Sequence, residues 1–194
     1  LARGITLAEN RWEGYMDVLA RVFPQSKQSW IIGITGLPGS GKSTLTGKLV
    51  EALCEEKTVG VIAVDPTSPF SGGAVLGDRV RMMDLAGREG VFIRSMASRG
   101  ALGGLSPAIS DTIALMEAYG CEVIIVETVG VGQSEVDIVA VADTTAVVLM
   151  PGMGDEVQAL KAGLLEIGDL FIINKADRSG AEELESLLGG MLTH

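Results

Sequence analysis

The stretch Gly36-Leu37-Pro38-Gly39-Ser40-Gly41-Lys42-Ser43 decides the fold of this chain, because it matches the pattern GxxxxGK[ST] in full. It directly follows the apolar run 30–35 and opens a segment with helical character. Between a strand and a helix, such glycines let successive backbone N–H groups turn toward phosphate oxygens, and the helix N-terminus adds partial positive charge. The stretch therefore predicts a phosphate-binding P-loop.

Two side chains at the end of this loop have predicted tasks of their own. Lys42 is expected to lie in an exposed loop and to reach the β- and γ-phosphates of a nucleotide. The hydroxyl of Ser43 is expected to bind Mg²⁺. Because the loop is predicted to be exposed, loss of the Lys42 side chain is expected to change phosphate binding far more than stability.

Short apolar runs alternate with helical or mixed stretches along the rest of the chain. Runs without polar alternation are typical of strands that are buried on both faces of a parallel sheet. The sequence therefore predicts an α/β fold of the P-loop type, with a doubly wound, mainly parallel sheet and helices on both faces. The runs are 30–35, 59–64, 91–94, 123–126, 146–150 and 170–173, and the intervening stretches are 42–55, 79–88, 107–119, 134–142 and 156–167.

The first 29 residues differ from this alternation. Apolar residues recur at helical spacing until Pro24 interrupts the pattern. We expect an N-terminal helical arm over 1–29 and a nucleotide-binding domain over 30–194.

The tetrapeptide Asn174-Lys175-Ala176-Asp177 follows the last apolar run, at the edge where open α/β sheets bind ligands, and is expected one strand away from the P-loop. The carboxylate of Asp177 can accept hydrogen bonds from N1–H and the 2-amino group of guanine, whereas adenine offers no such donor pair. Asn174 is expected to bond the other edge of the base, and the stem of Lys175 to cover its face. The tetrapeptide thus favours GTP or GDP over ATP.

Acidic residues at strand ends are candidates for a magnesium site. Asp65 follows the run 59–64, and Asp78 is a second candidate in the glycine-rich segment that comes after it. Glu127 opens Glu127-Thr128-Val129-Gly130, which resembles the DxxG motif of GTPases with Glu in place of Asp. The backbone N–H of Gly130 is expected to donate to the γ-phosphate.

Composition argues against several other classes. The formal net charge of −10 is unfavourable for a nucleic-acid binder or a basic membrane-surface protein. Two cysteines and one histidine are too few for the usual zinc or nickel sites. No apolar run reaches the ~20 residues that a membrane-spanning helix needs. We expect a cytoplasmic protein that binds neither nucleic acid nor membranes.

Taken together, the motifs resemble the MeaB/ArgK family of GTPases. The resemblance is carried by GLPGSGKST, VIAVDPTSP, LGDRVRM, SRGALGGL, VETVGVGQSE, PGMGDEVQALKAGLLEIGD and NKAD, in this order. It implies a SIMIBI-class P-loop fold and a Mg²⁺-dependent GTPase. It also implies a chaperone for an adenosylcobalamin-dependent acyl-CoA mutase, especially methylmalonyl-CoA mutase, and a homodimer formed through a C-terminal arm. Since few residues follow Asp177, the GTPase domain is expected to be truncated after the NKAD motif.

The resemblance also implies roles for individual residues. The phosphate contacts are Gly39, Ser40, Gly41, Lys42, Ser43 and Thr44, and guanine is read by Asn174, Lys175 and Asp177. The residues around Mg²⁺ are Ser43, Asp65, Asp78 and Glu127, and the catalytic set is Lys42, Asp65, Glu127 and Gly130. Segments 70–78, 130–135 and 152–157 become candidate switch loops.

Two other functions remain open at the level of the sequence. A nickel-insertion GTPase of the same wider class would need Cys or His ligands, which this chain lacks for a site of the usual kind. A non-catalytic nucleotide-sensing module would bind GTP without turning it over. Metal titration discriminates the first of these from a mutase chaperone, and measured GTP turnover discriminates the second.

Overall fold

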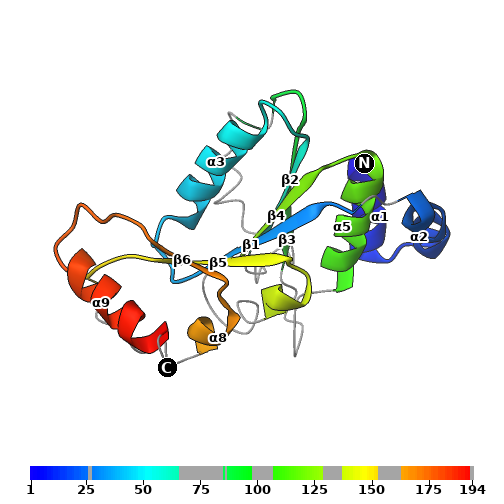
Figure 1. The fold of residues 1–194 in the computed structure, drawn as a ribbon. Coiled ribbons are helices and arrows are strands. Elements are labelled where there is room, and N and C mark those ends of the chain that lie inside the picture. The colour runs from blue at the N-terminus through cyan, green and yellow to red at the C-terminus, as the bar shows by residue number, and fades with distance from the viewer. Residues whose placement is uncertain are drawn as a thin grey trace, which may run out of the picture.

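Six parallel strands organise the part of the chain that the structure describes. This computed structural model describes residues 1–25, 28–65, 85, 87–97, 107–128, 137–152 and 163–192. The strands follow the order β3-β2-β4-β1-β5-β6, and each neighbouring pair is parallel (Figure 1). Their bounds are β1 Trp30–Thr35, β2 Val59–Asp65, β3 Val91–Ala97, β4 Val123–Thr128, β5 Thr144–Leu149 and β6 Leu170–Ile173. Each predicted apolar run forms a strand, which confirms this part of the prediction.

Helices cover both faces of the sheet, as predicted. On one face, α3 packs its Val50 against Ile34 and Ile125 of the central strands. On the other face, α5 packs Ile109 and Met116 against the sheet. The helical segments are α1 Ala2–Asn10, α2 Tyr15–Val22, η1 Phe23–Gln25, α3 Lys42–Leu53, α5 Pro107–Tyr119, η2 Ile138–Ala140, α8 Leu165–Ile167 and α9 Ala181–Leu192. The predicted α/β P-loop fold is confirmed.

Three of the predicted helical stretches are described only in part. Most of 79–88 lies outside the described residues, and Gly87 and Arg88 form a turn and bend instead of a helix. The described part of 134–142 contains the 3-10 turn η2, and that of 156–167 contains the short helix α8. The remaining residues of these stretches lie outside the described residues, and their predicted helical character stays a prediction.

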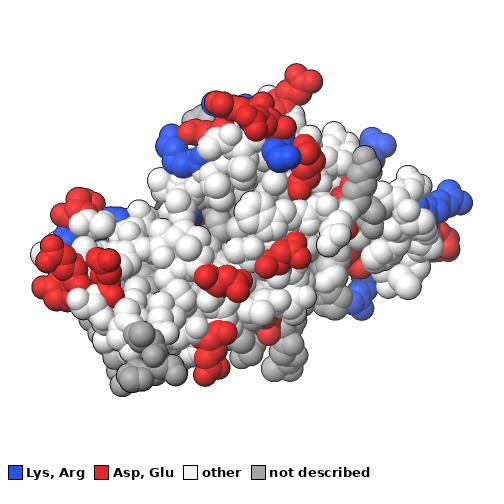
Figure 2. Space-filling model, viewed as in Figure 1, with Lys and Arg blue, Asp and Glu red and all other residues white. Residues whose placement is uncertain are grey.

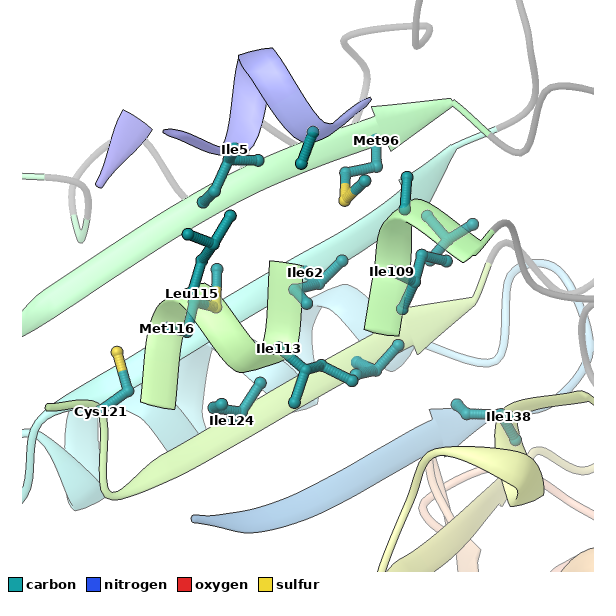
Figure 3. Packing of buried hydrophobic residues seen from close by; sticks show 14 of the residues in the cluster. Ile5, Ile62, Met96, Ile109, Ile113, Leu115, Met116, Cys121, Ile124 and Ile138 are labelled. Carbon is teal, nitrogen blue, oxygen red and sulfur yellow. The ribbon is translucent and has the colours of Figure 1, made fainter. Parts of the chain in front are cut away.

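The N-terminal helices pack on α5 and join the main hydrophobic core. Ile5 of α1 and Leu19 of α2 are buried in the cluster that includes Ile109 and Met116 of α5 (Figure 3). Arg94 of β3 donates a 2.6 Å hydrogen bond to Glu9, which ties α1 to the edge of the sheet. These contacts make the first helices a cover of the sheet in the described structure, and the division at residue 29 stays a prediction.

On the face shown in Figure 2, acidic side chains form the more extensive charged groups. In the view of Figure 2, acidic side chains collect over α9, whose first turn holds Glu182 and Glu183. Basic side chains on this face lie singly or in small groups. Among the helices of the described residues, not one combines the length and the apolar character needed to cross a bilayer.

Substitution of Gly33 tests the packing of η2 against β1. A Cβ atom at this position would lie 2.8 Å from Ile138 Cγ1 and 3.1 Å from Ala142 Cβ, so Gly33→Ala forces η2 away from the sheet. We expect the free energy of unfolding in urea to fall by about 1–3 kcal/mol. Gly190→Ala in α9 is the control, because a Cβ there meets no atom within 4 Å. It should raise stability by up to about 1 kcal/mol. An unchanged stability of Gly33→Ala would contradict this packing.

Candidate functional site

The turn between β1 and α3 is built from glycines that no other residue replaces easily. Gly36 has φ +132°, and a Cβ on it would collide with the carbonyl oxygen of Val148 in β5. Gly41 precedes α3 with φ +95°, and its Cβ would collide with Nδ2 of Asn174. Both positions lie in the left-handed region that glycine adopts without cost. Gly36 and Gly41 are thus explained by close approach as well as by backbone conformation.

Ser40 contributes a buried hydroxyl to this turn. Its side chain is fully buried, and its Oγ has no hydrogen-bond partner among the described residues. A buried hydroxyl without a protein partner is rare in folded proteins. Ser40 follows Gly39 and directly precedes the N-terminal end of α3, where backbone N–H groups remain available for an anion. The glycine-rich turn and its unpartnered buried hydroxyl therefore fit a polar ligand such as a phosphate group.

Lys42 is buried, and the prediction of an exposed loop position is wrong. The residue is 6% exposed and begins α3. Its Nζ donates to the carbonyl oxygens of Gly36 at 2.7 Å and Leu37 at 3.0 Å. The loop curls around the ammonium group because an amine buried at this depth needs acceptors. Lys42 therefore stabilises the loop as well as offering a cation to it.

Ser43 and Glu127 meet across the space between α3 and β4. The hydroxyl of Ser43 donates a 2.6 Å hydrogen bond to Oε1 of Glu127, and both side chains are buried. A serine hydroxyl and a carboxylate are the hard oxygen ligands that Mg²⁺ prefers, next to a turn that fits a phosphate. The donor set therefore fits a magnesium ion, and two of the four predicted metal ligands lie side by side.

The NKAD segment reaches the P-loop from β6. Nδ2 of Asn174 donates to the carbonyl oxygen of Ser40 at 2.8 Å, and Nζ of Lys175 donates to that of Gly39 at 2.7 Å. Lys175 holds φ +56°, an uncommon conformation for a residue with a side chain, and such strain concentrates at functional sites. These two side chains join segments that are more than 130 residues apart in sequence.

The NKAD segment was predicted to lie one strand away from the P-loop, and this prediction is wrong. β5 lies between β1 and β6, so NKAD follows the second strand away from the P-loop and not the first. The side chains of Asn174 and Lys175 span the intervening strand end. Asp177 lies beyond them and is exposed, as is Thr44 on the first turn of α3. An exposed carboxylate at this position is accessible to a ligand.

Several predicted site residues fall on parts that are not described. Asp65 ends β2 at the same edge of the sheet, but its side chain is outside the described set. Asp78 and Gly130 lie outside the described residues, as do segments 70–78 and 130–135 and residues 153–157 of the third candidate switch. Their proposed roles stay predictions.

The sequence analysis missed two buried threonines at this edge. Thr35 ends β1 and Thr128 ends β4, and their hydroxyls are hydrogen-bonded at 3.0 Å. A signal was present, because each threonine directly precedes or lies within a predicted motif. What the sequence could not show is that β1 and β4 are neighbours, which brings the two strand ends together.

Among the residues that the structure describes, cysteines and acidic side chains outside this edge form no second metal site. Burial raises the pKa of the Cys121 thiol to about 11, so this residue is a protonated core side chain at neutral pH. Burial also raises the pKa of Asp111, although Arg11 opposes the shift. Within the described ranges, no group of three or more His, Cys, Asp or Glu side chains is arranged to hold a metal ion.

The parallel sheet, with its glycine-rich turn leading into α3, defines this chain as a P-loop NTPase by fold. Its family follows from comparison with known proteins. The family model described as "Methylmalonyl Co-A mutase-associated GTPase MeaB" matches residues 1–194, so the chain belongs to the MeaB family.

Similar proteins agree with this assignment. A putative GTPase of Pyrococcus abyssi is 59% identical over 182 residues, which cover 93% of this chain and 56% of that protein. GTPase ArgK of Escherichia coli is 43% identical over 182 residues, covering 91% and 55%. The chain thus spans little more than half the length of these relatives.

Solved structures confirm the architecture. A crystal structure titled LAO/AO transport system kinase is similar with TM-score 0.72 and 33% identity, covering 98% of this chain and 56% of that one. Hydrogenase maturation factor HypB from Archaeoglobus fulgidus has TM-score 0.59 at 21% identity, covering 97% and 79%. The second likeness concerns the fold alone.

Because Lys42 is buried, removal of its side chain should lower stability as well as nucleotide affinity. Lys42→Ala takes a charged donor from the carbonyls of Gly36 and Leu37, so we expect stability of the nucleotide-free protein to fall by about 1–3 kcal/mol. Affinity for GDP and GTP should also fall sharply. Lys48→Ala is the control, because that side chain is 72% exposed and should change stability by less than about 0.5 kcal/mol. Equal stability of the Lys42→Ala and parent proteins in urea unfolding would contradict a structural task for Lys42.

Proposed function

We propose that this chain is the nucleotide-binding part of a GTPase that hydrolyses GTP to GDP and phosphate. The observation that carries the proposal is the pair of hydrogen bonds from Asn174 and Lys175 to the P-loop. Through this pair, the segment that would select the base is held against the loop that would hold the phosphates. One rigid site can then bind both ends of a guanine nucleotide. The family description, which names a GTPase, supports the same activity.

Four residues are proposed to hold a magnesium ion. Ser43 and Glu127 supply adjacent buried oxygens, and Asp65 and Asp78 are proposed to complete the set. When bound, Mg²⁺ neutralises charge that develops on the phosphate oxygens. In this proposal Lys42 exchanges its loop carbonyls for phosphate oxygens, and Ser43 exchanges Glu127 for the metal. The backbone N–H of Gly130 is proposed to hold the γ-phosphate, together with the amides of the P-loop.

The remaining phosphate contacts are proposed to come from the loop and the first turn of α3. Gly39, Ser40, Gly41 and Thr44 surround the point where the backbone turns into the helix. Glycine amides and the helix N-terminus favour an anion there. The buried hydroxyl of Ser40 adds a polar atom that has no hydrogen-bond partner among the described residues.

The partner is proposed to be an adenosylcobalamin-dependent acyl-CoA mutase, with methylmalonyl-CoA mutase as the first candidate. The printed family description, which names an association with methylmalonyl-CoA mutase, supports this choice. In the longer protein, the GTPase is proposed to act as a homodimer in the cytoplasm and to assist the mutase as a chaperone. A nickel-insertion role has no specific observation in its favour, because the likeness to HypB concerns the fold alone.

Replacement of Asp177 tests the base pocket. Asp177→Asn puts a donor where guanine also has a donor, whereas xanthine carries a carbonyl acceptor at its 2-position. Preference should therefore move from GTP toward XTP, by a factor on the order of 10² or more, since buried polar groups without partners are penalised strongly. Binding of both nucleotides is measured by calorimetry. Asp17→Asn on α2 is the matched control, because Asp17 is also an exposed aspartate but lies on an N-terminal helix.

If the Asp177→Asn variant retains the parental preference for GTP over XTP, Asp177 is not part of the base pocket. Equal affinity of the unsubstituted protein for ATP and GTP would overturn the guanine specificity as a whole.

Hydrolysis by the isolated protein should be slow and should rise when the mutase docks. GTPases that orient their own water carry Gln after the glycine of the third motif, whereas this chain has Val131 there. Arg79, Arg81 and Arg99 are candidates for a cation that the partner brings into place, an effect worth about 10³–10⁵ in rate. Single-turnover GTP hydrolysis with and without methylmalonyl-CoA mutase measures the effect. Fast hydrolysis that the mutase leaves unchanged would contradict this regulation.

A further inference from the structure

The threonine pair at the ends of β1 and β4 carries an inference of its own. Thr128 Oγ1 donates to Thr35 Oγ1 at 3.0 Å, and the two side chains are 1% and 0% exposed. Parallel pairing of these strands runs as far as Ile34 and Glu127, one residue before the threonines. The hydroxyl bond therefore continues the connection between the strands at the point where their ladder pairing ends.

The threonines lie on the opposite face of the sheet from α3. Side chains alternate between the faces of a strand. Ile34 packs with Val50 of α3, and Glu127 contacts Ser43 of the same helix, so the next residue of each strand points the other way. The ends of β1 and β4 are thus connected on both faces, by Ser43 and Glu127 on one and by the threonine pair on the other.

Three hydrogen bonds at this edge, together with the backbone between consecutive residues, form a closed ring. They join Thr128 to Thr35, Lys42 Nζ to the carbonyl of Gly36, and Ser43 to Glu127. The ring passes through the consecutive pairs Thr35-Gly36, Lys42-Ser43 and Glu127-Thr128. Because the residues involved are buried, each bond acts in a low local dielectric.

We propose that Thr35 and Thr128 are positioning residues for GTP hydrolysis, and the proposal rests on the function proposed above. Nucleotide and metal would take Lys42 and Ser43 as ligands, which replaces two bonds of the ring. Neither threonine is a proposed ligand of the nucleotide or the metal. The hydrogen bond between them therefore persists when the bonds of Lys42 and Ser43 are replaced. It keeps the entry to the P-loop and the Glu127 end of β4 at a constant separation.

The position of the threonine pair predicts that loss of its hydrogen bond affects GTP turnover and GDP binding differently. GDP contacts the P-loop and the base pocket, neither of which requires β4 to be held in position. Hydrolysis requires the γ-phosphate and metal to be aligned between the P-loop and the end of β4, and small displacements there are costly. Loss of the threonine bond should therefore lower the rate of the chemical step and leave GDP affinity nearly unchanged.

The experiment compares Thr35→Val, Thr128→Val and the double variant with the unsubstituted protein. Valine keeps the shape and removes the hydroxyl. We expect single-turnover hydrolysis at saturating GTP to fall about threefold to tenfold, the range that one hydrogen bond supports. GDP affinity should stay within about twofold. The double variant should be no slower than the slower single variant, because all three lack the same bond.

Two further sets of variants separate positioning from stability. Thr35→Ser and Thr128→Ser retain the hydroxyl and should restore most of the rate. Thr112→Val removes a buried hydroxyl that donates to Ala108 within α5, so it should change unfolding without changing turnover. Urea unfolding of the nucleotide-free protein gives a readout besides activity, in which the two valine substitutions should be non-additive.

The outcomes are distinct. An unsubstituted protein that neither binds GDP nor hydrolyses GTP refutes the proposed function, and the positioning role with it. An active parent whose valine variants keep the parental rate, or lose GDP affinity as much as rate, overturns the positioning role alone. If a valine variant fails to fold, Thr35→Ala and Thr128→Ala replace it, since they remove the hydroxyl without adding a methyl group at its place. The same comparison of rate with affinity then decides.

Discussion

Parallel pairing of the strands is the constraint on which the rest of this structure depends. Since neighbouring strands run in the same direction, their carboxyl ends meet at one edge of the sheet, and the polar residues at those ends are forced together. Glu127 thereby comes within hydrogen-bond distance of Ser43. The hydrogen bond between Ser43 and Glu127 offsets part of the cost of burying these polar groups. The apolar strand interiors, packed between α3 and α5, hold the edge in place.

The P-loop is held in shape by its neighbours as much as by its own glycines. Lys42 bonds back to the start of the loop, while Asn174 and Lys175 bond to its middle from β6. These donors satisfy carbonyl oxygens that a tight turn leaves without helix or sheet partners. Lys42 and Lys175 thus organise the loop in the described structure, and the proposed function has Lys42 change partners when phosphate binds.

This arrangement gives the proposed GTPase a physical basis for coupling its parts. In the proposed function, ligands replace the bonds that Lys42 and Ser43 make within the protein, whereas neither Thr35 nor Thr128 is a proposed ligand contact. In the proposed positioning role, the threonine bond would hold β1 and β4 together while the contacts of Lys42 and Ser43 are exchanged for ligands. The family to which the chain belongs is described as a GTPase associated with methylmalonyl-CoA mutase.

The sequence by itself determined the strands, the P-loop and the family, because buried parallel strands and phosphate loops leave local signals. A continuous apolar run such as 123–126 and a complete GxxxxGK[ST] pattern are recognisable without knowledge of their neighbours. Tertiary structure alone decided the burial of Lys42, the strand between β1 and β6, and the meeting of Thr35 with Thr128. These depend on strand order and on which carbonyls a curled loop presents. Both arise from contacts between residues far apart in the chain, which no local pattern encodes.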